Sequence, residues 1–131
     1  MTKEELSKYY YLSKEIEQIQ SKIDEIKSTY IGTSKINGMP HSRTLTSPQE
    51  RLMMLVEKYQ QKLERKKTEA IKEMLKIETY LTNIEDIETR MIFNYRYIER
   101  KEWEQIARLM HMGIATVFRK HKEQLKVSSE N

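Results

Sequence analysis

Basic and apolar side chains near the C-terminus have the types and the spacing needed to bind duplex DNA. Five basic residues and one acidic residue, Glu123, lie between Arg108 and Lys126. An arginine can donate two hydrogen bonds to guanine, lysines bind phosphate oxygens, and apolar side chains contact thymine methyl groups. Eight residues supply these groups and form the predicted DNA-binding site: Arg108, Ile114, Ala115, Thr116, Phe118, Arg119, Lys120 and Lys122.

The roles within this set follow from side-chain chemistry and from position. Arg119 carries the planar fork that reads guanine O6 and N7, so it is the predicted base-reading residue. The first residues of a recognition helix reach base edges, which leaves apolar contacts for Ile114, Ala115 and Phe118. Three further basic residues fit phosphate contacts, which set affinity and salt dependence without reading sequence. They are Arg108, Lys120 and Lys122.

A helix-turn-helix is the element that would position these residues. The sequence predicts a helix from Trp103 to Met110, a turn at His111–Gly113 and a second helix that begins at Ile114. Ala107 allows the two helices to approach closely, Met112 fills the turn, and Val117 packs the second helix onto the first. Gly113 stands where a Ser or Thr cap is common, so the start of the second helix is weakened slightly.

A third helix is expected upstream of this pair. Its apolar face consists of Ile87, Met91, Ile92, Tyr95 and Ile98. We expect Trp103 to fill the gap between this helix and the next, and His121 to be packed or phosphate-bonded. The predicted DNA-binding domain covers residues 83–127, followed by a disordered tail at 128–131.

The segment from Ile84 to Leu125 resembles region four of bacterial sigma factors. Within that group it is most similar to the ArpU-like and RinA-like transcriptional activators of phages and prophages of Gram-positive bacteria. They share an Arg-Tyr-Ile run and a Trp-x-x-Ile-Ala signature, matched here by Arg96, Tyr97, Ile98, Trp103, Ile106 and Ala107. The resemblance implies a helix-turn-helix protein that binds promoter DNA. A contact with host RNA polymerase stays open.

Two long amphipathic helices are predicted before this domain. The first has a heptad pattern formed by Tyr9, Leu12, Ile16, Ile19, Ile23, Ile26 and Tyr30. The second begins at a Ser47 cap and has an apolar stripe formed by Leu52, Val56, Tyr59, Leu63, Ala70, Met74, Ile77, Leu81 and Ile84. Gly, Pro and polar residues at 29–47 predict a loop between them. An antiparallel helical hairpin over residues 1–82 follows.

This hairpin is also the expected site of oligomerisation. Lys66 interrupts the second stripe, and the step from Ala70 to Met74 breaks strict heptad spacing. Two narrow, mismatched seams satisfy each other only partly. Since DNA half-sites are normally read by symmetric dimers, we expect a homodimer through residues 3–82.

Composition restricts the remaining possibilities. The 131 residues are 34% charged, contain three Gly and two Pro, and carry a formal net charge of +4, which favours an all-α protein of long helices. There is no cysteine, which fits a reducing cytoplasm. No apolar run is long enough for a membrane span. No spacing predicts a metal site, a cofactor or a catalytic triad, so we expect a protein that is not an enzyme.

Three functions remain compatible with the sequence. The leading interpretation is a transcriptional regulator of a phage or prophage that binds double-stranded DNA. The second is an accessory of DNA packaging, like a small terminase subunit, or of recombination. The third is a coiled-coil interaction protein whose helix-turn-helix no longer binds DNA. Ring-shaped assembly would favour the second, and a dimer the first.

Overall fold

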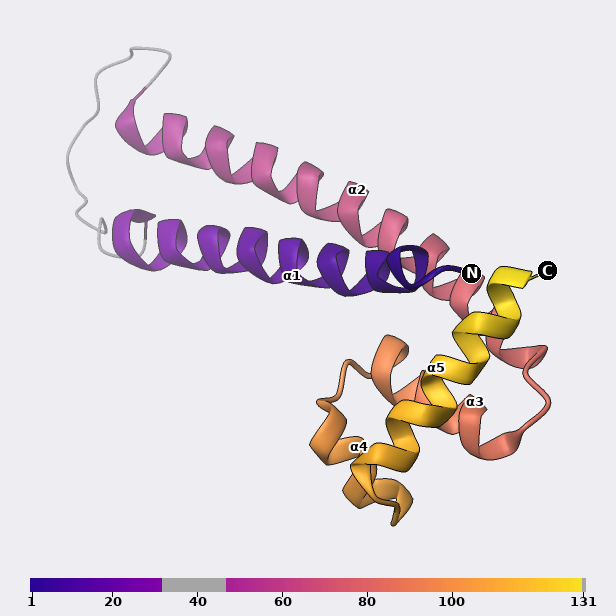
Figure 1. The fold of residues 1–131 in the computed structure, drawn as a ribbon. Coiled ribbons are helices and arrows are strands. Elements are labelled where there is room, and N and C mark those ends of the chain that lie inside the picture. Colours follow the sequence, from indigo (N-terminus) through magenta and orange to yellow (C-terminus); the bar gives the residue numbers. More distant parts are fainter. Residues whose placement is uncertain (32–46, 131) are drawn as a thin grey trace. The chain divides into compact units, whose positions relative to one another are not determined.

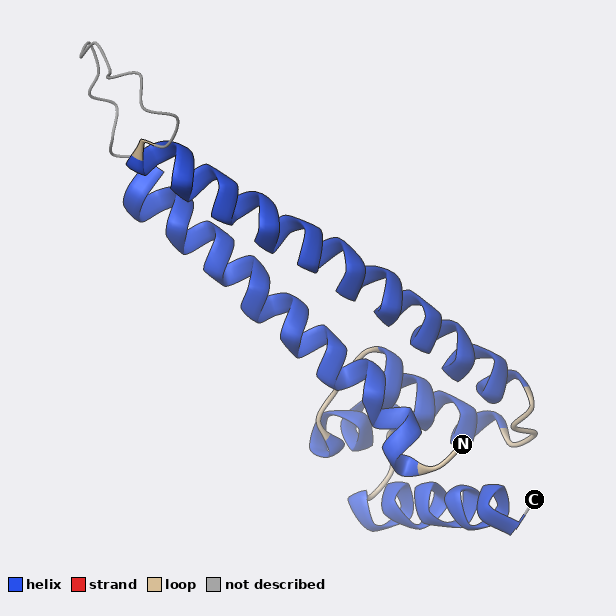
Figure 2. Cartoon of the chain, turned by 90° about the horizontal axis from the view of Figure 1, so that it is seen from above, coloured by secondary structure: helices blue, strands red, loops and turns tan. Residues whose placement is uncertain are grey.

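The computed structural model describes residues 1–31 and 47–130, and within these residues the protein is all-helical (Figure 2). The elements in chain order are α1 (Lys3–Ile26), the π-helical turn η1 (Lys27–Ile31), α2 (Pro48–Thr82), α3 (Ile87–Phe93), the π-helical turn η2 (Asn94–Ile98), α4 (Trp103–Met110) and α5 (Ile114–Glu130) (Figure 1). The expected all-α class is confirmed. Residues 32–46 of the expected loop at 29–47 lie outside the described residues.

The two long helices begin at residues whose side chains cap them. The Ser47 hydroxyl accepts a hydrogen bond from the backbone N–H of Glu50 at 3.0 Å, as its position before Pro48 predicts. At the start of α1, Thr2 accepts from the N–H of Glu5 at 3.2 Å, and its hydroxyl donates to the Glu5 carboxylate. These contacts satisfy backbone donors that have no partner within a helix.

Contacts divide the chain into two compact units, residues 14–68 and residues 1–13 together with 69–131. This grouping differs from the division between residues 82 and 83 expected from sequence. The reason is that the first turns of α1 and the last turns of α2 pack with the C-terminal helices. Leu6, Ile77 and Leu81 share one cluster with Phe93 and Tyr97.

Within residues 14–68, α1 and α2 lie antiparallel and bury the predicted seam. The buried cluster contains Ile19, Ile23, Ile26, Val56 and Leu63. Lys66, expected to interrupt this seam, lies 3.4 Å from the Glu15 carboxylate of the other helix. Lys66 of α2 therefore forms an ion pair with Glu15 of α1, and this pair compensates the charge of the lysine within the seam.

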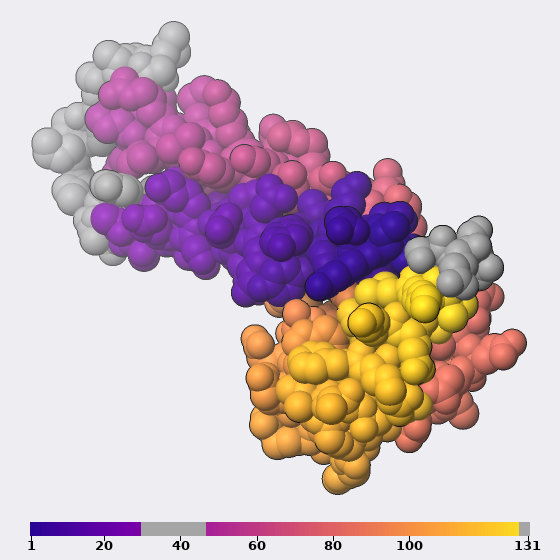
Figure 3. Space-filling model, in the orientation of Figure 1, coloured from indigo at the N-terminus to yellow at the C-terminus, as the bar shows by residue number. Residues whose placement is uncertain are grey.

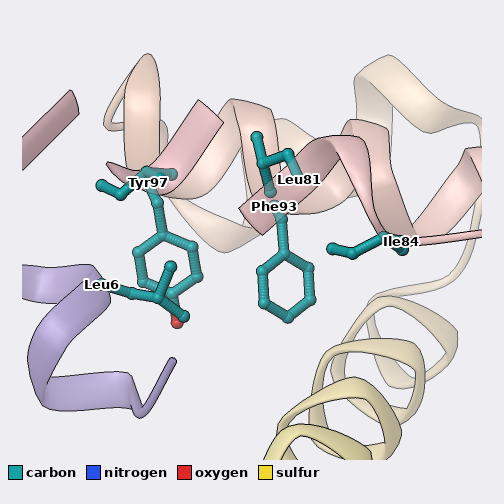
Figure 4. Packing of buried hydrophobic residues seen from close by; sticks show 6 residues of the cluster. Leu6, Leu81, Ile84, Phe93 and Tyr97 are labelled. Atoms are coloured by element: carbon teal, nitrogen blue, oxygen red, sulfur yellow. The ribbon is translucent and has the colours of Figure 1, made fainter. Parts of the chain in front are cut away.

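The core of the other unit is built around aromatic rings (Figure 4). Phe93 and Tyr97 project toward the same side, with Leu6 of α1 beside Tyr97 and Ile84 beside Phe93. Leu6 and Phe93 are fully buried. This arrangement corrects the expected apolar face of the third helix. Ile92 is buried as predicted, but Ile87 and Met91 are 61% and 43% exposed.

The buried face of α3 is formed by Thr89, Ile92 and Phe93 at ordinary helical spacing, and Tyr97 of the π-helical turn η2 continues it. The backbone N–H of Glu99 bonds to the carbonyl of Asn94, five residues earlier, at 3.1 Å. Such a widened turn shifts the residues that follow around the helix axis. The turn can therefore affect the direction of Tyr97 and Ile98, whereas Phe93 is already directed into the core by α3.

Glu73 is a buried carboxylate of α2 that no sequence pattern marked. Its side chain lies 3.4 Å from the Lys8 ammonium group and 3.2 Å from that of Lys76. Burial opposes its ionisation, but hydrogen bonds and charge from Lys76 and Lys8 outweigh burial and lower the pKa of Glu73. The Lys8–Glu73 ion pair thus ties the start of α1 to α2, whereas the Lys76–Glu73 pair lies within α2.

The end of α5 is also ordered by contacts with α2. The Tyr80 hydroxyl contacts the Ser128 hydroxyl and accepts a hydrogen bond from the Gln124 amide at 3.2 Å. The helix continues to Glu130, so the tail expected to be disordered at 128–131 is helical over its first three residues. Residue 131 lies outside the described part of the chain.

Candidate nucleic-acid interface

The α4–turn–α5 segment has the joint that the sequence predicts. Ile106 and Val117 are fully buried, Ala107 is 8% exposed, and all three pack with Ile92 of α3. Met112 is partly buried against the same cluster. A buried small residue at 107 allows α4 and α5 to approach closely. The predicted packing roles of Ala107, Met112 and Val117 are confirmed.

The turn reverses the chain at His111, which ends α4 in a left-handed conformation with φ 55° and ψ 44°. Its backbone N–H bonds to the carbonyls of Ala107 and Arg108, and the N–H of Met112 bonds to the carbonyl of Ala107 at 3.0 Å. These bonds satisfy carbonyls at the end of α4. Gly113 then precedes α5, and its carbonyl accepts from the N–H groups of Thr116 and Val117.

Trp103 connects three elements. Its ring lies 5.2 Å from the Phe118 ring and 4.8 Å from the His121 ring, both in edge-to-face geometry. The Arg96 guanidinium covers it at 4.5 Å, a cation–π contact from η2. Trp103 therefore contacts the preceding element η2 as expected, and it also packs against Phe118 and His121 in the first half of α5.

His121 lies inside the domain and makes a polar contact there. Its Nε2 atom and the Tyr97 hydroxyl are 2.5 Å apart, and the His121 ring is 5.0 Å from the Phe93 ring. Burial, with the positive charges of Lys3 and Arg96, lowers the pKa of His121 to about 4. Burial raises the pKa of Tyr97 to about 12. His121 is thus neutral at neutral pH, and of its two expected roles the packed one is confirmed.

The face of α5 opposite Val117 carries predicted DNA-binding residues. At 100° per residue, Ala115, Arg119 and Lys122 fall on one side of the helix, with Phe118 at its edge. The first three are exposed, and Phe118 is 45% exposed. Figure 3 shows α5, in yellow, on the surface of its unit. Ile114 and Arg108 are also exposed, and Thr116 is half-buried.

Arg119 and Lys120 both have acidic partners within the protein. Arg119 Nη1 lies 3.4 Å from the Glu123 carboxylate one turn later, with both side chains more than half exposed. Lys120 Nζ lies 3.2 Å from Asp86 and 3.4 Å from Glu88, and its side chain is only 19% exposed. An exposed pair such as Arg119–Glu123 is weak and opens readily. Lys120, in contrast, is held by two carboxylates.

Asp86 is the functional neighbour that sequence reasoning missed. It caps α3 by accepting from the backbone N–H of Thr89 at 3.1 Å and from the Thr89 hydroxyl at 2.6 Å. The hydrogen bonds from Thr89 and then from Lys120 lower the pKa of Asp86. The capping pattern Asp86-x-x-Thr89 was visible in the sequence, but its pairing with Lys120, 34 residues away, was not.

The described residues show neither a metal centre nor a membrane-spanning element. Among residues 1–31 and 47–130 no group of three His, Asp or Glu side chains could hold a metal ion. No helix in that part of the chain has the length and apolar character needed to cross a bilayer. The geometry offers a solvent-facing helix surface with positive charge.

Residues 50–128 match the model of a family described as "Protein of unknown function (DUF1492)". The match covers more than half of the chain, from the start of α2 to the end of α5, so the protein belongs to this family. No curated protein and no solved structure matches the chain.

Proposed function

We propose that this member of the DUF1492 family is a sequence-specific double-stranded DNA-binding protein that regulates transcription in a phage or prophage. The observation that carries the proposal is the exposed face of α5. Ala115, Arg119 and Lys122 lie opposite the buried Val117, so the joint that fixes α5 directs these three outward. A major groove accepts a helix with such a face.

The chemistry of this face supports a division of roles. Arg119 and the apolar side chains of Ile114, Ala115 and Phe118 lie in the first half of α5 and read bases. Lys122 and Arg108 bind phosphates on either side. Lys120 is assigned the weakest phosphate contact, because Asp86 and Glu88 already neutralise its charge. The resemblance to ArpU-like and RinA-like activators supports the regulatory role.

The proposal includes a homodimer in the cytoplasm. Two copies would read two half-sites about one helical turn apart. No membrane contact, cofactor or catalytic activity is part of the proposal, and a contact with host RNA polymerase is left open.

The experiment that tests this function is selection of bound sites from a random pool of duplex DNA by the full chain. We expect enrichment of one motif with two related half-sites. If the protein retained all duplexes of the pool equally, with no motif enriched, sequence-specific binding would be contradicted. A repeat of the selection with Val117→Asp gives the baseline, because a charge in the buried joint unfolds the domain.

A further inference from the structure

An apolar ridge and a groove occupy one face of the unit formed by residues 1–13 and 69–131. The ridge consists of Ile71 and Leu75 of α2, which are 53% and 54% exposed. At helical spacing the same stripe of α2 continues through Glu78 and Thr82, which line the groove. Ridge and groove are therefore neighbours on one continuous surface.

The groove lies between the end of α2 and the α3–η2 segment and has a volume of about 520 Å³. Its apolar lining comes from Leu81, Met91 and Tyr95, and Met91 is 43% exposed. Large apolar side chains gathered on one surface mark an interaction site more often than single exposed ones do. A groove between two helices is a site that accepts a helix.

The ridge and the groove each carry one charge of opposite sign that is not neutralised. Lys72 follows Ile71 on the flank of the ridge. Glu78, Glu99 and Arg90 line the groove, but Glu99 pairs with Lys101 at 3.7 Å and Arg90 donates to the Ile84 carbonyl at 3.3 Å. Neither Lys72 nor Glu78 has an ion-pair partner among the described residues. A partner suited to the groove would present apolar side chains next to a positive charge, and the ridge of this protein has that composition.

We propose that this surface joins two copies of the chain about a two-fold axis, with the ridge of each copy in the groove of the other. A two-fold interface must be self-complementary. This surface meets that condition because it carries both the ridge with the positive Lys72 and the groove with the negative Glu78. In an antiparallel crossing of two α2 helices, Ile71 and Leu75 face Thr82 and Glu78 of the second copy. Lys72 then lies within one turn of the second copy's Glu78.

The inference rests on the homodimer of the proposed function and relocates its interface. The seam residues of α1 and α2, from which a dimer was expected, are buried against each other within one chain. Most of them are buried, and Ile16, Leu52 and Tyr59 are partly buried against the same cluster. The outward face of α2 provides an exposed apolar surface, and it does not involve the DNA-binding face of α5.

Sedimentation velocity of the full chain without DNA, at tens of micromolar, tests the interface. We expect a dimer for the wild type and at least a tenfold weaker dimer for Leu75→Ser. Leu109→Ser is the matched control, since Leu109 is 45% exposed on α4, away from the ridge. It should leave the dimer unchanged. Circular dichroism melting of each variant verifies that the fold is retained.

Reversing the charges of Lys72 and Glu78 distinguishes loss of the interface from loss of the fold, because a restored dimer in the double variant cannot result from unfolding. Lys72→Glu and Glu78→Lys should each weaken the dimer, and the double variant should restore it. A monomeric wild type, a ring of more than two copies, or equal effects of Leu75→Ser and Leu109→Ser would overturn the proposal. A dimer that persists in Leu75→Ser would refute this interface while leaving the homodimer intact, and site selection tests DNA reading separately.

Discussion

The ammonium group of Lys120 on α5 lies 3.2 Å from the carboxylate of Asp86, the residue that caps α3. The Asp86 carboxylate thus caps the N-terminus of α3 and also forms an ion pair with a side chain of α5. Hydrogen bonding to Asp86 raises the pKa of Lys120 although partial burial opposes it, and Glu88 adds to the effect. The contact makes Lys120 part of the domain's framework, whereas its neighbour Lys122 is exposed.

This difference predicts opposite phenotypes for two neighbouring lysines. Lys120→Gln should lower the free energy of unfolding by about 0.5–1 kcal/mol, because an ion pair at the surface is lost. It should reduce the salt dependence of DNA binding much less than Lys122→Gln does, because Asp86 and Glu88 already neutralise the charge of Lys120. Lys122→Gln should leave stability unchanged and reduce the salt slope by about one unit. Urea titrations and binding isotherms at several salt concentrations measure both. Equal salt slopes for the two variants would refute the distinction.

The buried His121 predicts a loss of stability in mild acid. Its pKa is about 4 in the folded protein, below the ordinary value of 6.5, so the unfolded chain binds the proton more readily. Stability due to neutral His121 is complete above pH 6.5 and falls as the pH drops toward 4. Between pH 7 and pH 5 we expect wild type to lose about 1–2 kcal/mol more than His121→Gln. Urea titrations at both pH values decide. A parallel loss in both proteins would assign the effect to other groups.

Gly113 predicts a stabilising substitution at the start of α5. A Cβ atom at this position would meet no atom within 4 Å. The carbonyl of Gly113 already accepts hydrogen bonds from the backbone N–H groups of Thr116 and Val117. Gly113→Ser should add a side-chain cap and restrict the unfolded chain, which together raise stability by about 0.5 kcal/mol. Thermal and urea unfolding measure the gain. Gly113→Ala, which restricts the chain without capping, is the control, and a larger gain from Ala would contradict capping.

The parts of the fold that sequence predicted are those governed by local spacing. The heptad of α1, the Ser47 cap and the buried Ala107 and Val117 all follow from periodicity or turn chemistry within a few residues. The buried side of α3 did not follow, because two helical faces share Ile92, and the packing of Phe93 and Tyr97 against Leu6, Ile77 and Leu81 selects the face that excludes Ile87 and Met91. Leu6 was missed because its partners Phe93 and Tyr97 are about ninety residues away in the chain.

In the candidate site, too, features set by local spacing were predictable from the sequence and features set by tertiary contacts were not. The outward direction of Arg119 and Lys122 was predictable from their spacing to Val117. The partners of Lys120 were not, since Asp86 and Glu88 reach it only after α3 packs against α5. The exposed ridge at Ile71 and Leu75 was not predicted either, because these two residues lie outside the apolar stripe of α2 and two positions are too few to form a periodic pattern.

The most direct test of the account measures the binding of Arg119→Ala and Lys122→Ala to the selected site and to unrelated duplex DNA. If α5 reads the major groove, Arg119→Ala should cost about 1–3 kcal/mol on the selected site and relax preference at one base pair. Lys122→Ala should weaken both DNAs alike. Equal losses with an unchanged preferred sequence, or binding that survives both substitutions, would contradict the claim that this face of α5 reads DNA.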